Sequence, residues 1–436
     1  MEKYKLLINL GLKYLKRYRR RYAFLFAALV FCFAIVTFIT SSKDSMYRNV
    51  YYSAQSHYAG DIIAVGQDKA YEYTFHLKDY QITNILDAVN ESAINPAHII
   101  KRTYFNNVGI VYFNGMSIVQ KYIIGCDWEK EAHLFSKMDF SSSANGSLED
   151  DSIIVSEPVA QQLNAKIGDI ITLEVYNLWG QKNTGQYKVS GIVKDYSIFG
   201  YFKVYVSRLS LNRLMFIDDE ECSVIGFFFK NPSDAEEKRQ RLQRSLAQRI
   251  EMGPIVYNRE ERDAEMVKDW EGSKVFLYTL PVYLSEIASL MDAMDILTYL
   301  LYGIMLIIIL VSASVTYRLI LHERTREIGV MRSIGFYSND LKLVLWTEIT
   351  ILGFISIVSG FLLSVIFSIA ASFISFSWFP SFEIFLRNGR LTALFLPGTV
   401  VINIILTLII LILTVIFPAN RASEKNLPSL LSGEPL

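Results

Sequence analysis

The side chains best placed to recognise another molecule lie together at residues 322–336, with the sequence HERTREIGVMRSIGF. Acids and bases are mixed there, and Ile328 and Met331, three residues apart, would give a short helix an apolar edge. Gly335 can adopt the left-handed conformation that ends a helix, and Ser338 could cap the next helix. The stretch therefore predicts a short, two-faced docking helix. The alternative is a solvated loop whose charges only set the orientation of the chain in a membrane.

The sequence offers no candidate for covalent, metal or nucleotide chemistry. It lacks the GxxxxGK(S/T) loop that holds ATP phosphates, the HExxH and GxSxG motifs, and any Cys/His spacing typical of zinc. Cys32, Cys126 and Cys222 form no metal or redox spacing; Cys32 lies within an apolar stretch, and we expect Cys126 and Cys222 to be free, since they could pair only if the fold happened to bring them together. His133 and the acids of 123–129 lack ligand spacing. We therefore expect no catalytic residue, metal or bound cofactor, so that energy would have to come from a partner.

Apolar stretches on both sides of this segment are long enough to cross a membrane. Residues 296–320 contain no acid and one base, Arg318, and as a helix they would reach roughly 37 Å, enough for a bilayer. Similar stretches occur at 22–40, 350–374 and 394–417. The chain is 52% hydrophobic with a mean hydropathy of +0.27, too polar for spans alone. The expected fold is an α-helical membrane protein with four transmembrane helices and a large mixed α+β extracytoplasmic domain inserted between helices 1 and 2.

The distribution of Lys and Arg sets the expected orientation. Bases dominate residues 1–21 and the loop at 318–342, and cytoplasmic loops carry such an excess. A signal peptide is the alternative for the N-terminus, but the apolar stretch is too long and no clear cleavage site follows. We expect a multi-pass protein of the cytoplasmic (inner) membrane with both termini cytosolic. The predicted limits are a cytosolic basic N-terminus at 1–21, transmembrane helices at 22–41, 296–320, 345–375 and 394–417, an extracytoplasmic domain with helical stalks at 42–295, a cytosolic coupling helix and loop at 321–342, a short outer loop at 376–393 and a cytosolic tail at 418–436.

The extracytoplasmic stretch mixes strand-like and helix-like patterns. Residues 42–58 and 281–295 would continue the first two spans as helical stalks, and Asn114-Gly115 is a strong signal for a hairpin turn. The Ser-, Gly- and acid-rich residues 137–151 predict an internal domain boundary. Strands are expected at 61–66, 73–77, 99–105, 108–113, 117–124, 170–175, 187–193, 202–206 and 222–229, with helices at 78–90, after Ser156 and at 231–250.

Glu348 lies near the cytosolic start of the third span, and an acid inside a membrane is a candidate functional group. It could serve a proton or substrate path. We favour a structural role, in which it reaches the membrane interface or pairs with a base such as Lys342. Gly353 and Gly360 in the same span allow close helix packing, for instance against a second membrane subunit.

The segment ERTREIGVMRSIG closely resembles the signature of the FtsX-like ABC transporter permeases, the family of MacB and of the lipoprotein-releasing LolC and LolE. In addition, IIVSEPVAQQLNAKIGDIITL at 153–173 and YKVSGIVKD at 187–195 resemble the periplasmic core domain of that family. The resemblance implies a coupling helix that sits in a cleft of a separate ATPase subunit. The residues expected to dock on that ATPase are Glu323, Arg324, Arg326, Glu327, Ile328, Met331, Arg332 and Gly335.

The resemblance implies a permease subunit of the mechanotransmission type, without an ATPase motif of its own. ATP and Mg would be bound by an ABC ATPase dimer, and the permease would pair with a second copy or a paralogue in membrane lipid. The cargo would be a lipoprotein, a peptide or another amphiphile, handed to an extracytoplasmic acceptor or adaptor; no nucleic acid is expected. Two alternatives stay open: an FtsX-like regulator of a cell-wall hydrolase, and a peptide-sensing permease that signals to a kinase.

Overall fold

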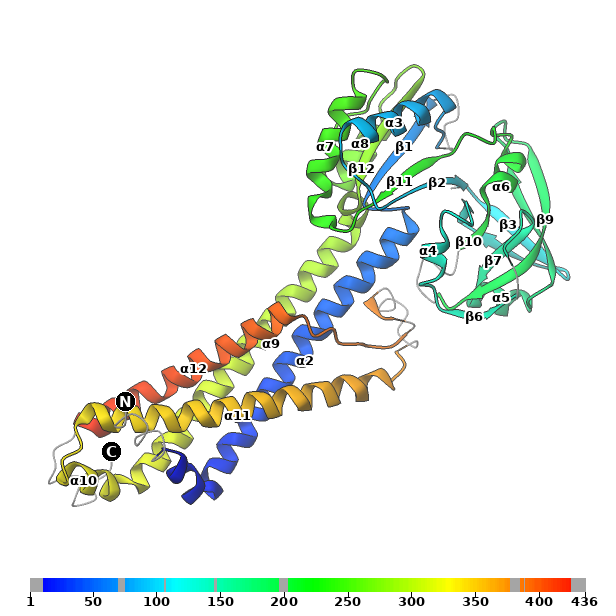
Figure 1. Cartoon of the computed structure of the whole chain (residues 1–436). Coiled ribbons are helices and arrows are strands. Elements are labelled where there is room, and N and C mark those ends of the chain that lie inside the picture. The colour runs from blue at the N-terminus through cyan, green and yellow to red at the C-terminus, as the bar shows by residue number, and fades with distance from the viewer. Residues whose placement is uncertain are drawn as a thin grey trace. The chain divides into compact units, whose positions relative to one another are not determined.

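The computed structural model describes residues 11–69, 75–105, 107–144, 147–195, 203–376, 385–387 and 389–424. Parts of the predicted N-terminus, of the strand at 73–77, of the outer loop and of the cytosolic tail lie outside these residues. The chain forms two compact units (Figure 1). The first comprises Met1–Tyr47, Met291–Ser375 and Arg390–Leu436, and the second comprises Arg48–Leu290 and Phe376–Gly389.

Four helices of the described residues are long and apolar enough to cross a membrane. They are α2 (Arg19–His57), α9 (Leu280–Glu323), α11 (Ser338–Ser372) and α12 (Pro397–Glu424). With 39 and 44 residues, α2 and α9 reach about 58 and 66 Å, roughly twice the hydrocarbon thickness of a bilayer. Both predicted stalks are therefore helical continuations of spans, as expected. The limits of the membrane itself stay a prediction.

Glycines let the helices of the first unit approach one another closely. A Cβ on Gly353 would lie 2.7 Å from Leu411 of α12, and a Cβ on Gly360 would lie 2.9 Å from the backbone of Val30 in α2. These glycines of α11 therefore pack within the chain rather than against a second subunit.

Polar contacts join the helices of this unit beyond their apolar stretches. Lys43 of α2 forms an ion pair of 2.9 Å with Asp295 of α9, and Tyr47 donates to the carbonyl of Met291 at 2.7 Å. Thr399 of α12 donates to Asp44 at 2.6 Å. Because these groups come from three helices, α2 is fastened to both α9 and α12.

The second unit contains a four-stranded antiparallel sheet in the order β12-β1-β11-β2. With α3 and α7, the chain order β-α-β-β-α-β gives the ferredoxin-like arrangement. Residues of β1, β11 and β12 that alternate along each strand form one core with α3 and α7, which cover this face of the sheet (Figure 1). The elements are β1 (Ile62–Asp68), α3 (Asp79–Glu91), β2 (His98–Phe105), β11 (Val224–Phe228), α7 (Ala235–Leu246), α8 (Arg259–Val267) and β12 (Ser273–Thr279).

Between β2 and β11 the chain forms an inserted lobe whose strands continue the same sheet. The order runs on as β2-β5-β10-β7-β9-β8-β3-β4, with β6 beside β9, which makes twelve strands in the part of the chain that is described. The lobe contains β3 (Gly109–Phe113), β4 (Met116–Gln120), β5 (Tyr122–Cys126), α4 (Ala132–Phe135), β6 (Phe140–Ser143), β7 (Ser152–Ser156), α5 (Glu157–Leu163), β8 (Ile170–Tyr176), β9 (Lys182–Val193), β10 (Lys203–Ser207) and α6 (Arg208–Met215).

The predicted boundary at 137–151 is wrong. Within it, β6 pairs with β9, and the ring of Phe140 lies against Gly191. The exposed serines that suggested a linker belong to this strand. The chain enters the inserted lobe after β2 and leaves it before β11, so the lobe has two boundaries in the sequence rather than one.

Of three local predictions for the second unit, the hairpin turn is confirmed, one strand is wrong, and one helix cap is only partly correct. The Asn114-Gly115 hairpin is confirmed, because Phe113 pairs with Met116 and both turn residues have positive φ. The single strand expected at 117–124 is wrong, since β4 and β5 divide there. Ser156 precedes α5 as expected, but its side chain makes no capping hydrogen bond.

Candidate functional site

The candidate site is the turn between α9 and α11, which contains the short helix α10 (Thr325–Ser333). The chain does not continue as one helix from α9, because Arg324 leaves helical geometry with φ −95° and ψ 4°. At the other end, Gly335 has φ 102°. Gly335 and Phe336 donate their N–H groups to Arg332 and Met331, a Schellman motif. The prediction for Gly335 is therefore confirmed, whereas α11 begins at Ser338, which leaves Tyr337 and not Ser338 at the N-cap position.

One face of α10 packs against its own chain. Ile328 is fully buried and Met331 nearly so, in a core that also contains residues of α2, α9 and α11. Tyr14, in the helical residues 11–17, donates its hydroxyl to the sulfur of Met331 at 3.7 Å. The apolar edge that the sequence predicted exists, but it holds α10 in place.

Arg324 is buried as well, with 1% of its side chain exposed. Its Nη1 donates to Oε2 of Glu348 in α11 at 2.8 Å, and Tyr22 of α2 donates to the same oxygen at 2.7 Å. The guanidinium also lies over the ring of Tyr14, 4.2 Å from its centre. The partner of Glu348 is thus Arg324, and not Lys342, the example the sequence suggested. The pair ties the break between α9 and α10 to α11 and α2.

The carboxylate of Glu327 forms polar contacts with the residues that precede α2. Tyr18 donates a hydrogen bond to its carboxylate, Arg17 lies 3.7 Å from it, and Arg324 approaches it to 3.8 Å. Burial and the Glu327 carboxylate raise the pKa of Tyr18, so its hydroxyl stays protonated and remains a donor.

The opposite face of α10 is exposed. Val330 is 48% exposed, and Ile334 and Tyr337 are each 74% exposed. Of the predicted docking residues, Glu323, Arg326 and Gly335 are exposed, Glu327 and Arg332 are half-buried, and Arg324, Ile328 and Met331 are buried. The sequence analysis missed Val330, Ile334 and Tyr337: Val330 lies within α10, Ile334 is its C-cap residue, and Tyr337 is the N-cap residue of α11. A short helix with exposed apolar side chains beside charges can fit a groove of another protein.

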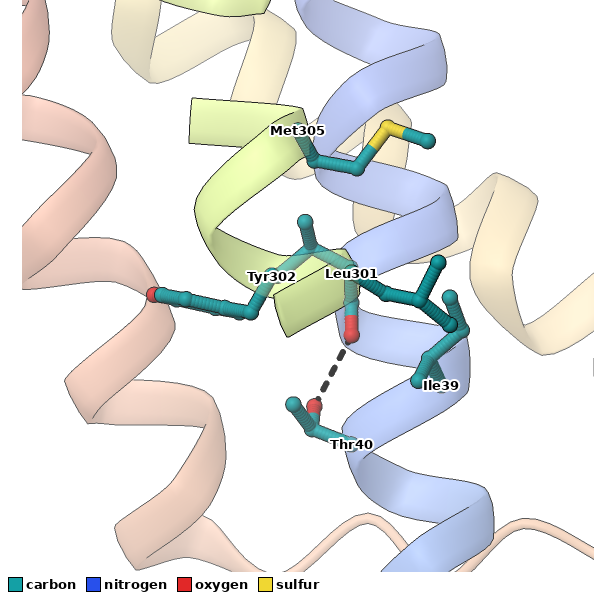
Figure 2. A pocket seen from close by; sticks show the side chains of 6 residues that line it. Ile39, Thr40, Leu301, Tyr302 and Met305 are labelled. Atoms are coloured by element: carbon teal, nitrogen blue, oxygen red, sulfur yellow. Dashed lines mark hydrogen bonds between the residues drawn. The ribbon is translucent and has the colours of Figure 1, made fainter. Parts of the chain in front are cut away.

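Apart from this turn, a small pocket lies between α2 and α9 (Figure 2). The hydroxyl of Thr40 already donates to the carbonyl of Val36 at 3.0 Å. The lining is otherwise apolar except for Tyr302, so the depression has little to recognise a polar ligand. No group of three or more metal-binding side chains occurs among the residues described here. The lining residues are Val36, Ile39, Thr40, Leu301, Tyr302 and Met305.

Two family models match the chain. The MacB-like periplasmic core domain matches residues 23–245, just over half of the chain, and the FtsX-like permease C-terminal domain matches residues 299–427. The second match contains α10 and the helices on both sides of it. No curated protein matches the chain.

Three solved structures are similar to parts of the chain. The extracellular domain of the noncanonic ABC-type transporter YknZ from Gram-positive bacteria is 12% identical, covers 44% of this chain and 87% of its own, and has a TM-score of 0.28. The periplasmic region of MacB from Actinobacillus actinomycetemcomitans is 11% identical, with coverage of 52% and 92% and a TM-score of 0.31. A domain of a putative permease protein from Porphyromonas gingivalis is 11% identical, with coverage of 42% and 78% and a TM-score of 0.25.

These structural likenesses are low, and the assignment depends on the two family models. One model covers the first long helix and most of the second unit, and the other covers the turn between α9 and α11 with most of the remaining long apolar helices. The chain therefore belongs to the FtsX/MacB type of ABC transporter permeases.

Proposed function

We propose that the chain is the membrane subunit of a mechanotransmission transporter, in which a separate ABC ATPase docks on the exposed face of α10. The observation that carries the proposal is the division of α10 into two faces. Ile328 and Met331 fasten it to the chain, while Val330 and Ile334 face outward beside Arg326. A partner that pressed on the outward face would push against a helix whose other face is anchored.

Displacement of α10 would be carried along α9. This helix is continuous from Leu280 to Glu323, and its backbone hydrogen bonds lie within the helix, so lipid offers them no competing partner. The Arg324–Glu348 pair adds a fixed connection between the start of α10 and α11. We infer that this path takes movement from the cytosolic side to the extracytoplasmic unit at 42–295.

The remaining parts of the proposal are supported by membership of the FtsX/MacB type of permeases and by the distribution of bases along the chain. An ABC ATPase dimer would bind ATP and Mg, and a second permease copy or paralogue would complete the membrane path, because four candidate spans are half of what transporters of this kind use. The cargo class would be a lipoprotein, peptide or other amphiphile, released to an acceptor or adaptor at the outer face. Residues 1–21, 321–342 and 418–436 would be cytosolic.

The docking test compares two exposed apolar residues. Ile334→Ala removes a contact on the proposed docking face, and Phe373→Ala, at a residue that is 77% exposed at the far end of α11, is the matched control. We expect Ile334→Ala to weaken binding of the cognate ATPase to the permease in nanodiscs by about 2 kcal/mol, roughly 30-fold. Arg326→Glu should also lower the ATPase stimulation, and the control should change neither quantity.

Equal affinities for the Ile334 and Phe373 variants would contradict docking on α10. The side of the membrane is tested separately with Ser333→Cys, an exposed position on α10. The three native cysteines are buried, so a membrane-impermeant maleimide reports the new thiol. Labelling in intact cells would place the turn outside and end the proposal, whereas labelling only after permeabilisation supports it.

A further inference from the structure

The C-terminal end of α2 is buried inside the second unit, where water cannot satisfy its carbonyl groups. The last four carbonyls of a helix lack partners within the helix. At this end, the carbonyl of Ser56 accepts a hydrogen bond of 2.6 Å from Nη1 of Arg102, and that of His57 accepts one of 3.3 Å. The hydroxyl of Tyr104 also donates to the His57 carbonyl, at 2.6 Å. A guanidinium therefore caps the helix, where a positive charge is also favoured by the helix dipole.

Arg102 occupies a special position in the sheet. It is the last residue of β2 that pairs with β11, opposite Val224, and the next residue, Thr103, already pairs with Gly125 of β5. Its side chain bonds to Glu131, which precedes α4, through Nε at 3.0 and 3.1 Å and Nη2 at 2.6 Å. Both side chains are fully buried. One guanidinium thus joins the end of α2, the ferredoxin-like sheet and the inserted lobe.

Asp61 makes a second connection just beyond the helix end. Its side chain is fully buried. Its Oδ1 accepts hydrogen bonds from Tyr51 and, at 2.9 Å, from Gln55, both in α2. Its Oδ2 accepts the backbone N–H of Phe229 at 2.8 Å. The Asp61 carbonyl accepts the N–H of Leu280, the first residue of α9, at 3.0 Å. Both long helices are therefore bonded to the same residue.

We propose that Arg102, with Glu131 and Asp61, forms a rigid joint through which movement of α2 and α9 is passed to the sheet and to the inserted lobe. The inference deepens the proposed function, since a joint matters for transport only if the helices move. Arg102 and Asp61 are positioning residues in this scheme and touch no cargo. The joint holds because each buried charge has its hydrogen bonds satisfied by groups from different elements.

Lysine cannot replace Arg102 in this role. Arginine presents its donors as a planar fork, so it can bind a carboxylate on one side and backbone carbonyls on another. The ammonium group of lysine has one nitrogen, so it would lose its hydrogen bonds either to Glu131 or to the carbonyls at the end of α2. Arg102→Lys therefore keeps the charge but opens the joint. Arg239 of α7, also fully buried and paired with Glu236, bonds to the Val256 and Leu277 carbonyls and not to α2 or α9.

The experiment measures the joint directly in the full-length protein. Nitroxide labels are placed at two exposed positions, Ser53→Cys near the end of α2 and Thr83→Cys on α3. The native cysteines are buried and need not be removed. Pulsed electron–electron resonance gives the distance distribution in nanodiscs, with the cognate ATPase, before and after trapping with ATP and vanadate. Arg102→Lys is compared with the matched control Arg239→Lys.

We expect one narrow distribution in the wild type and in Arg239→Lys, unchanged by trapping, because α2 and the sheet move together. Arg102→Lys should broaden the distribution and shift it on trapping, with a melting temperature close to that of Arg239→Lys. A distribution that stays narrow in Arg102→Lys, or equal broadening in both variants, would overturn the joint. Unchanged ATPase binding in the docking variants would refute the proposed function instead, and would leave the distances measured without nucleotide as they are.

Discussion

The ion pair between Arg324 and Glu348 predicts a large loss of stability when either partner is removed alone. Both side chains are almost inaccessible, with exposed fractions of 1% and 0%. Removing one partner of a buried pair leaves an uncompensated charge, at a cost of about 3–5 kcal/mol. For a unit of this size, about 1 kcal/mol lowers the melting temperature by 2–4 °C, so Glu348→Leu should lower it by roughly 6–20 °C.

The double variant tests whether the two losses have one cause. Replacement of a whole buried pair by apolar side chains is often neutral, so Arg324→Met with Glu348→Leu should melt within a few degrees of the wild type. The sum of the two single losses would then far exceed the loss in the double variant, the mark of directly interacting residues. Arg326→Met is the matched control, because Arg326 is exposed on the same helix, and should change stability by about 0.5 kcal/mol or less.

The assay is thermal unfolding of the purified chain in one detergent, followed by size-exclusion chromatography of the fraction that stays folded. Additive losses in the double variant would refute direct pairing. A Glu348→Leu variant as stable as the wild type would refute the burial argument itself. Tyr22→Phe gives a graded check: it removes one hydrogen bond to the carboxylate, so its loss should be about 1.5–3 kcal/mol, smaller than that of Glu348→Leu.

Three further predictions concern the second unit. A Cβ on Gly226 would lie 1.5 Å from the carbonyl oxygen of Ala59, so Gly226→Ala should cost about 1–3 kcal/mol or more in thermal unfolding. Cys126 and Cys222 are buried, and burial raises the pKa of Cys222 to about 12, so a maleimide should modify neither until the chain is denatured. Burial and a neighbouring histidine lower the pKa of His133 in the folded chain. As the pH falls, the imidazole is therefore protonated in the unfolded chain before it is protonated in the folded chain. The contribution of His133 to stability should be constant above about pH 6.5 and fall below it, and this fall should be less steep in His133→Phe.

At the turn between α9 and α11, the sequence predicted where the helix ends better than which side chains are buried. Gly335 ends α10 as expected because only the local backbone decides that outcome. The facing of each side chain depends on which neighbours cover it, and the residues around Tyr14 that cover Ile328 and Met331 come from the far end of the sequence. Charged side chains that are close in sequence look equally solvated, so nothing local distinguished the buried Arg324 from the exposed Arg326.

In the second unit, local elements could be predicted but their pairing could not. The hairpin at Asn114-Gly115 is a local device and was predicted correctly. By contrast, β1 lies between β11 and β12, strands more than 150 positions later in the chain, and no short-range pattern contains that information. Strand β12 was missed altogether.

Two of the buried arginines, Arg324 and Arg102, lie at helix ends that are far apart in the chain. Arg324 lies where α9 ends, and Arg102 lies against the end of α2. At such ends the backbone leaves helical geometry and polar groups need new partners, which a guanidinium supplies from several sides at once. Arg324 is the N-cap residue of α10 and is buried against Glu348, so it cannot also contact a partner. The outward contacts must then come from side chains that the chain leaves uncovered, which here are Val330, Ile334 and Arg326.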